Sequence, residues 1–228
     1  MPVAVAARSR FHTILALALT ALVFVGFAPS YYLAPLFGAP AHTRLVHLHA
    51  ASFTAWLAAF VVQAWLVATR RTHLHVRLGR AGAVLAAVTI ALSAATVLDA
   101  GAAGRGRGGL TAAQQMAIPL TGLCLFAGFV GAGLLLRRRR DLHGRLMTLG
   151  LLGALGPAIA RLWPGIGVQL AVLAVVLAAL FRRDYLSTGR VHRVYVLGGA
   201  ALAASWPLRV VIARSETWTG IATWLVGR

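Results

Sequence analysis

The sequence contains no lysine and little charge of any kind other than arginine. All 22 basic residues in the chain of 228 are arginines, and only four residues are acidic: Asp99, Asp141, Asp184 and Glu216. Without a lysine amine the protein cannot form a retinal Schiff base or use lysine-based covalent catalysis. Because the four acidic residues lie far apart in the sequence, a paired-carboxylate hydrolase and a carboxylate cage for a metal are both disfavoured. The single cysteine, Cys124, excludes an internal disulfide and is expected to be a buried, inert thiol.

Hydrophobic residues dominate what is present. They make up 60% of the chain, whereas charged residues make up 11%, and the mean hydropathy is +0.81. Soluble proteins lie far from this composition, so we expect an integral membrane protein. A net charge of +18 would suggest nucleic-acid binding in a soluble protein. Here the arginines flank apolar segments, which favours contact with anionic lipid head groups and no nucleic-acid partner.

Apolar runs bounded by Arg, Pro and Gly predict an all-α bundle of seven transmembrane helices in one domain, residues 1–228. The expected spans are 12–32, 45–69, 80–99, 114–136, 144–162, 165–182 and 193–213. A cytoplasmic N-terminus places 15 of the 22 arginines inside: Arg8, Arg10, Arg70, Arg71, Arg77, Arg80, Arg137 to Arg140, Arg145, Arg182, Arg183, Arg190 and Arg193. The positive-inside rule therefore predicts this orientation, with the C-terminus outside. The alternative is that the first span is a cleaved signal peptide, because "RSR" precedes its apolar core.

Two segments between or after the spans are expected at the outer surface. Residues 101–109, "GAAGRGRGG", predict a flexible connection, because no strand precedes them and their spacing is not that of a phosphate-binding loop. Residues 215–228, "SETWTGIATWLVGR", predict an interfacial amphipathic tail. Its apolar side would consist of Trp218, Ile221, Trp224 and Leu225.

The second expected span carries polar residues at a seven-residue spacing. On a helix His49, Trp56 and Gln63 form a single stripe, because residues seven apart differ in direction by only about 20°. We expect the stripe to face other helices rather than lipid. Two interpretations remain open: the side chains form hydrogen bonds that join helices, or they line a pathway or cofactor pocket.

Histidines recur where the first, third, fifth and seventh spans are expected to begin. They are His12 in "RFHTILALA", His75 in "LHVRLGRAG", His143 in "LHGRLMTLG" and His192 in "VHRVYVLGG". We expect them at one depth near the inner interface, either through duplicated helical hairpins or through independent use of interfacial basic residues.

A b-type haem is the most specific cofactor that these histidines suggest. It needs two imidazoles from different helices and cations for its propionates. His75, His143 and His192 supply candidate ligands on three helices. The nearby candidate cations are Arg77, Arg80, Arg145 and Arg193. Only one region on the outer side carries histidines (His42, His47 and His49), so a second haem is not expected. A weaker alternative is a metal bound by His73 and His75 in a loop.

Arg161 ends the fifth expected span near the outer interface. It either extends to the interface beside Trp163 or pairs with Asp99 at the outer end of the third span, where it would fix packing or gate an anionic ligand.

The motifs together resemble those of a family of predicted bacterial multi-pass membrane proteins with no assigned reaction. The shared pattern is the H…W…Q helix of His49, Trp56 and Gln63, then "HVRLGRAG", then "HGRLM" and "PAIARLWP", over residues 45–164. Val76 departs from it, since arginine is frequent there in the family. The "HGRLM" turn is also distantly similar to small membrane proteins of terminal-oxidase maturation. The resemblance implies a bacterial inner-membrane protein and no particular reaction.

The sequence therefore favours a non-enzymatic inner-membrane protein that binds a cofactor or small ligand in a polar interhelical seam and supports respiratory-chain assembly or redox chemistry. The alternatives are a b-type haem electron-transfer protein that uses His75 and His143, and a small-solute transporter. Anionic lipids are the expected partners of the arginine clusters, and a membrane-protein partner or a second copy of the chain is compatible with the pattern. The predicted cofactor-binding residues are His49, Trp56, Gln63, His75, His143, His192 and Arg161.

Overall fold

The computed structural model describes residues 2–104, 106 and 109–227, with side chains from Arg10 onward. All regular structure in this part of the chain is helical. The α-helices are α1 (Pro2–Phe27), α2 (Arg44–Ala68), α3 (Thr72–Ala102), α4 (Ala112–Leu135), α5 (Arg140–Gly153), α6 (Gly156–Leu162), α7 (Ile166–Thr188), α8 (Arg193–Arg214) and α9 (Glu216–Leu225). Two short helices, η1 (Ala28–Tyr32) and η2 (Ala34–Phe37), follow α1. The described part of the chain leaves out some of the arginines that the sequence analysis assigned to the two sides of a membrane. They are Arg105, Arg107, Arg228 and, for its side chain, Arg8.

Six of these helices are long and apolar enough to cross a membrane, and α5 with α6 makes a seventh candidate span that is bent by 41°. Their positions agree with the seven apolar runs expected from the sequence. The bend follows from Gly156 and Pro157, because proline disfavours helical geometry at the preceding residue. The third helix begins at Thr72 rather than near residue 80, so His73 and His75 are helical and the predicted loop is wrong.

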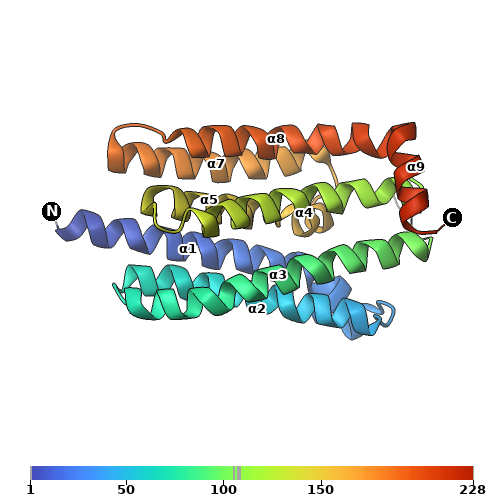
Figure 1. Cartoon of the computed structure of the whole chain (residues 1–228), viewed down its shortest axis with the longest axis horizontal. Helices are drawn as coiled ribbons and strands as arrows, with labels where there is room; N and C mark the ends of the chain where they lie inside the picture. The colour runs from blue at the N-terminus through green and yellow to red at the C-terminus, as the bar shows by residue number, and fades with distance from the viewer. Residues whose placement is uncertain (1, 105, 107–108, 228) are drawn as a thin grey trace.

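The long helices lie side by side, and successive helices run in opposite directions (Figure 1). Connections 69–71, 136–139 and 189–192 all lie at the end where the chain begins (Figure 1). Since these connections contain Arg70, Arg71, Arg137 to Arg139 and Arg190, we call this the arginine-rich end. The short helix α9 lies across the opposite end, which we call the α9 end (Figure 1).

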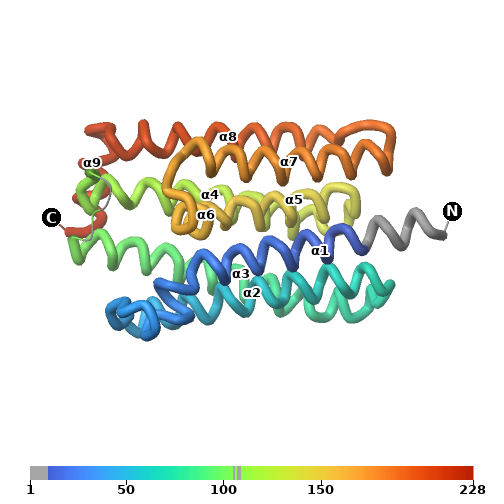
Figure 2. The backbone as a smooth tube through the Cα atoms, turned by 180° about the vertical axis from the view of Figure 1, so that it is seen from behind, coloured from blue at the N-terminus to red at the C-terminus, as the bar shows by residue number. Residues whose placement is uncertain are grey.

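The core runs through the bundle, because its buried cluster takes residues from every helix from α1 to α8. Helix α1 packs against α2 and α6, and Figure 2 shows it running between them. Trp56 and Leu57 of α2 pack in one buried cluster with Phe126 of α4 and Leu149 of α5. The rings of Trp56 and Phe126 meet edge to face with centroids 4.7 Å apart, a favourable aromatic geometry.

The predicted amphipathic tail is a helix from Glu216 to Leu225. Trp218 is anchored to the bundle, because its indole Nε1–H donates to the Ala113 carbonyl of α4 at 3.0 Å. Trp224 projects outward with 77% of its surface exposed. Cys124 is exposed on α4, so the expectation of a buried thiol is wrong.

The contact between α1 and α6 leaves no space for a side chain at Gly26. A Cβ at this residue would lie 2.6 Å from the Ala158 carbonyl oxygen and 3.0 Å from the Ala158 Cα. Because those atoms are backbone, we expect Gly26→Ala to lower the free energy of unfolding by about 1–3 kcal/mol through overpacking. The thermal midpoint in detergent measures this effect. The matched control is Gly128→Ala, since no atom lies within 4 Å of a Cβ there, and an unchanged Gly26→Ala midpoint would contradict the packing.

Candidate cofactor site

Two histidines from different helices meet near the arginine-rich end. His75 lies in the first turns of α3 and His143 in the first turn of α5. The centroids of their imidazole rings are 6.1 Å apart and their planes are nearly perpendicular, at 76°. Both side chains are half-buried. The structure therefore brings together two of the three candidate haem ligands of the inner interface.

The orientation of His143 is fixed by a backbone carbonyl. Its Nδ1 lies 2.7 Å from the carbonyl oxygen of Gly133 in α4. A carbonyl only accepts, so Nδ1 carries the proton and Nε2 is left as the basic nitrogen of the ring. This is the arrangement in which histidine ligands are commonly held, because the second nitrogen fixes the tautomer and the ring direction. The close approach of α4 and α5 favours a glycine here, since a Cβ at residue 133 would lie 3.0 Å from the Met147 sulfur and the methionine side chain would have to shift.

His75 presents a nitrogen whose hydrogen-bonding capacity is not used. Its Nδ1 is buried and has no hydrogen-bond partner. Its carbonyl accepts a bond of 3.2 Å from Nε2 of Gln63 in α2, while the Gln63 Oε1 is also buried without a partner. Unsatisfied buried polar atoms are costly and rare. Their presence beside a second imidazole marks a place where a ligand would gain binding energy.

The polar stripe of α2 faces other helices, as its spacing predicts. Gln63 contacts α3 through His75, and Trp56 packs on Phe126 of α4. His49 lies 3.2 Å from the Ser93 hydroxyl of α3 through Nδ1. Ser93 donates its own proton to the Thr89 carbonyl at 2.6 Å, so the His49 Nδ1–H must be the donor. Ser93 was missed in the sequence because nothing distinguishes it from other helical serines.

A buried ion pair lies next to the histidine pair along α5. Arg145 and Asp184 of α7 are 8% and 5% exposed, and their side chains form a salt bridge. The Arg145 Nε also donates to Asp184 Oδ2 at 3.3 Å, and Nη1 donates to the Asp141 carbonyl at 2.6 Å. The sequence proposed Arg145 as a partner for haem propionates. The geometry does not support that role, because the guanidinium is bound to Asp184.

Asp184 also organises the start of α8. Its Oδ2 accepts the His192 backbone N–H at 2.8 Å. Its partner Arg145 also contacts α8, because the guanidinium carbon lies 5.6 Å from the centre of the Tyr195 ring. One signal in the sequence points to Asp184, namely that it is one of only four acidic residues and follows a long apolar run. The identity of its partner, 39 residues away, is not encoded in any local pattern.

His192 belongs to this ion-pair cluster rather than to the histidine pair. It caps α8, since its Nδ1 accepts the Val194 N–H at 3.2 Å. Its Nε2 lies 3.9 Å from Asp141 Oδ2. Both ring nitrogens thus have neighbours of their own. The prediction that His192 is a cofactor ligand is not supported by this geometry, because capping fixes its ring toward the helix start.

Arg161 lies in the last turn of α6, whereas His75 and His143 lie in the first turns of α3 and α5. Its Nε donates to the Ser30 hydroxyl at 3.2 Å and its Nη1 to the Pro157 carbonyl at 2.9 Å. The guanidinium carbon lies 4.1 Å from the centre of the Phe27 ring. Arg161 therefore joins α6 to α1, and the expected cofactor-binding residues do not form one site.

The other histidines of the α9 end also lie apart from this site. His47 Nδ1 is 3.1 Å from the Tyr31 hydroxyl, whereas His42 Nε2 donates to the Ser30 carbonyl at 2.8 Å. His47 and His49 contact different elements, as expected for residues two apart on a helix. Within the described residues there is no group of three or more His, Cys, Asp or Glu side chains that could hold a metal ion.

Comparison of the chain with family models, curated proteins and solved structures finds no match to any of them.

Proposed function

We propose that this protein is a bacterial inner-membrane protein that binds one cofactor in its polar interhelical seam, and that this cofactor is a b-type haem held by His75 and His143. The observation that carries the proposal is the contact between these two imidazoles from separate helices, with one ring fixed through its Nδ1. Haem bound between membrane helices requires this combination of ligands and supporting contacts.

The spacing of the rings supports a single metal between them. A metal–nitrogen distance of about 2 Å on each side, plus about 1 Å from each nitrogen to its ring centre, separates two imidazole centroids by roughly 6 Å. The observed separation is 6.1 Å. The tautomer of His143 is compatible with this geometry, because Nε2 is the nitrogen left to bind.

The number of ligands favours haem over a free metal ion. A zinc or copper site in a protein usually takes at least three protein ligands, and no such group occurs in the described part of the chain. Haem iron brings four nitrogens with its macrocycle and needs only two axial ligands. Arg77 and Arg80, exposed on α3 beyond His75, supply cations for the propionates.

The orientation in the membrane follows from the arginine-rich end. We assign this end to the cytoplasm, which gives seven spans with the N-terminus inside and α9 at the outer surface. The alternating helix directions and the arginines at three connections on one end support this assignment. The resemblance of the H…W…Q helix and the "HGRLM" turn to predicted bacterial membrane proteins agrees with it.

A single haem near one face does not carry electrons across the bilayer. We therefore favour a role in respiratory-chain assembly or in redox chemistry at the cytoplasmic face over transmembrane electron transfer. A second copy of the chain or a membrane-protein partner would supply any further redox centre.

An absorption spectrum tests the proposal. The full-length protein is expressed in cells supplied with a haem precursor, purified in detergent and scanned from about 380 to 600 nm before and after dithionite. We expect a Soret band that shifts on reduction. A well-folded, monodisperse protein that is colourless and gains no such spectrum when haemin is added would overturn the haem assignment.

A further inference from the structure

A second buried arginine, Arg209 of α8, forms no salt bridge with any described residue. Its side chain is only 7% exposed. Its Nε donates to the Ser205 carbonyl at 3.1 Å and its Nη2 to the Ser205 hydroxyl at 2.9 Å. The guanidinium carbon lies 4.6 Å from the centre of the Trp206 ring. These partners are neutral and belong to the same helix.

Asp184 and Asp141, which do form salt bridges, contact other residues and not Arg209. Asp184 is paired with Arg145, and Asp141 lies beside His192. An arginine buried without a counter-charge is strongly unfavourable, and more so within a membrane. In membrane proteins such a residue marks a functional site by default.

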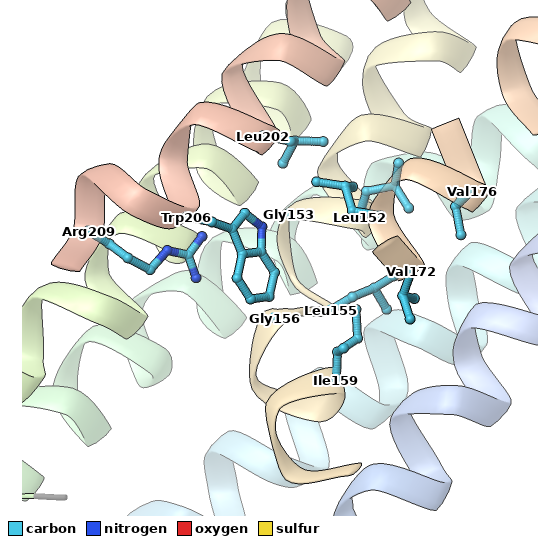
Figure 3. A pocket seen from close by; sticks show the side chains of 11 residues that line it. Leu152, Gly153, Leu155, Gly156, Ile159, Val172, Val176, Leu202, Trp206 and Arg209 are labelled. Atoms are coloured by element: carbon cyan, nitrogen blue, oxygen red, sulfur yellow. The ribbon is translucent and has the colours of Figure 1, made fainter. Parts of the chain in front are cut away.

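Arg209 lines a crevice where α7 and α8 meet the bend between α5 and α6. Figure 3 shows Arg209 at one end of the lining and Val176 at the other. The remaining lining is almost entirely apolar and includes Leu155, Val172 and Leu202. The enclosed part has a volume of about 10 Å³, which suits one group the size of a water molecule or an oxygen atom.

The crevice is polar near one face of the membrane and apolar toward the middle. Arg209 lies five residues before the end of α8, about 7 Å from the α9 end along the helix axis. Leu202 lies seven residues deeper, about 10 Å further toward the centre. An amphiphile in the same leaflet has its charged group and its chain in this order.

We infer that this crevice binds the anionic head of a membrane amphiphile. A carboxylate or phosphate oxygen would enter the enclosed part beside Arg209, and the acyl chain would lie outside it along the partly exposed Val172 and Val176. Gly156 keeps the head-group position open, because a Cβ there would lie 3.4 Å from Nη1 of Arg209 and 3.9 Å from the Trp206 ring. The inference requires the membrane setting but not the haem.

Quenching of Trp206 fluorescence reports occupancy directly, since this indole lies beside the guanidinium. The full-length protein is placed in neutral phosphatidylcholine nanodiscs and titrated with a dibrominated fatty acid, with dibrominated phosphatidylglycerol or with sodium phosphate. Trp206→Phe defines the share of the signal that comes from this residue among the six tryptophans. Sodium phosphate carries no bromine, so its binding is measured as a shift of the thermal midpoint.

We expect saturable quenching by one or both brominated amphiphiles and none in Trp206→Phe. Arg209→Gln should weaken the apparent affinity by about 10- to 100-fold through loss of charge-assisted hydrogen bonds, while Arg209→Lys should retain part of it. If Arg209→Gln fails to fold, Gly156→Ala is the second variant. It keeps the charge of Arg209 but narrows the head-group position, so it should also weaken binding. The fatty-acid and phosphatidylglycerol arms identify the head group.

Equal quenching in the wild-type protein and in Arg209→Gln would overturn the inference, as would quenching that never saturates. A thermal shift with phosphate alone would show that the site takes a small free anion and would also overturn it. The haem spectrum is recorded on the same samples. Its presence or absence in the wild-type protein decides the proposed function separately from this result.

Discussion

Replacing Asp184 by alanine is expected to lower the free energy of unfolding by about 3–5 kcal/mol, the loss typical when one partner of a buried ion pair is removed. The Arg145 guanidinium would remain 8% exposed with a positive charge and no carboxylate. The His192 backbone N–H would also lose its acceptor at the start of α8. The thermal midpoint and chemical unfolding in detergent measure the change.

Asp141→Ala is the matched control, because the Asp141 side chain is 64% exposed and 3.9 Å from its histidine neighbour. Exposed pairs of this kind contribute about 0–1 kcal/mol. A double variant, Arg145→Met with Asp184→Leu, should recover much of the stability lost in Asp184→Ala, since apolar replacement of both partners is often neutral or stabilising. If Asp184→Ala were no less stable than Asp141→Ala, the ion pair would not be a main element of the fold.

Helix positions could be predicted from the sequence because hydropathy depends on one segment at a time. Runs of apolar residues long enough to cross a membrane indicate helices whatever surrounds them. The helix ends were less predictable. Helix α3 continues back to Thr72, and α7 continues to Thr188, because arginine and histidine at a membrane interface are compatible with helix and do not end it.

Side-chain partners were predictable only where a repeated pattern placed them at one depth. The histidines before "RLG" and "RLM" pointed to His75 and His143, and the structure brings these two together. The same pattern misplaced His192, because its turn caps α8 instead of entering the seam. Arg145 was misjudged for a related reason, since a long-range partner such as Asp184 follows from packing and not from spacing.

The Arg209 crevice could not be derived from the sequence for a further reason. It exists because Gly156 and Pro157 bend the chain between α5 and α6 beside α8, whereas the sequence indicated one continuous span over 144–162. A bend of 41° between α5 and α6 changes which of their residues face the neighbouring helices. Nothing in the sequence around Arg209 therefore pointed to a binding site until its buried surroundings were known.

Substitution of either axial histidine is expected to abolish the proposed haem spectrum. His75→Ala and His143→Ala each remove one of two iron ligands, and we expect the haem content per protein to fall by at least about tenfold, since even supporting residues of such sites change affinity by 10- to 100-fold. Gly133 supplies only a carbonyl to His143, so His143→Ala leaves the helix contact itself in place. Haem content is measured by the reduced spectrum against protein concentration.

His192→Ala and His49→Ala are the matched controls, because these histidines contact Val194 and Ser93 rather than the histidine pair. They should retain haem at the wild-type ratio. Retention of a full spectrum in both His75→Ala and His143→Ala, with loss in His192→Ala, would move the site to the ion-pair cluster of α5, α7 and α8. Loss in all four variants at equal stability would contradict a site built by two imidazoles. His49 bonds to Ser93 and His192 to Val194, whereas His143 is oriented by Gly133, so the two control histidines take no part in orienting the pair.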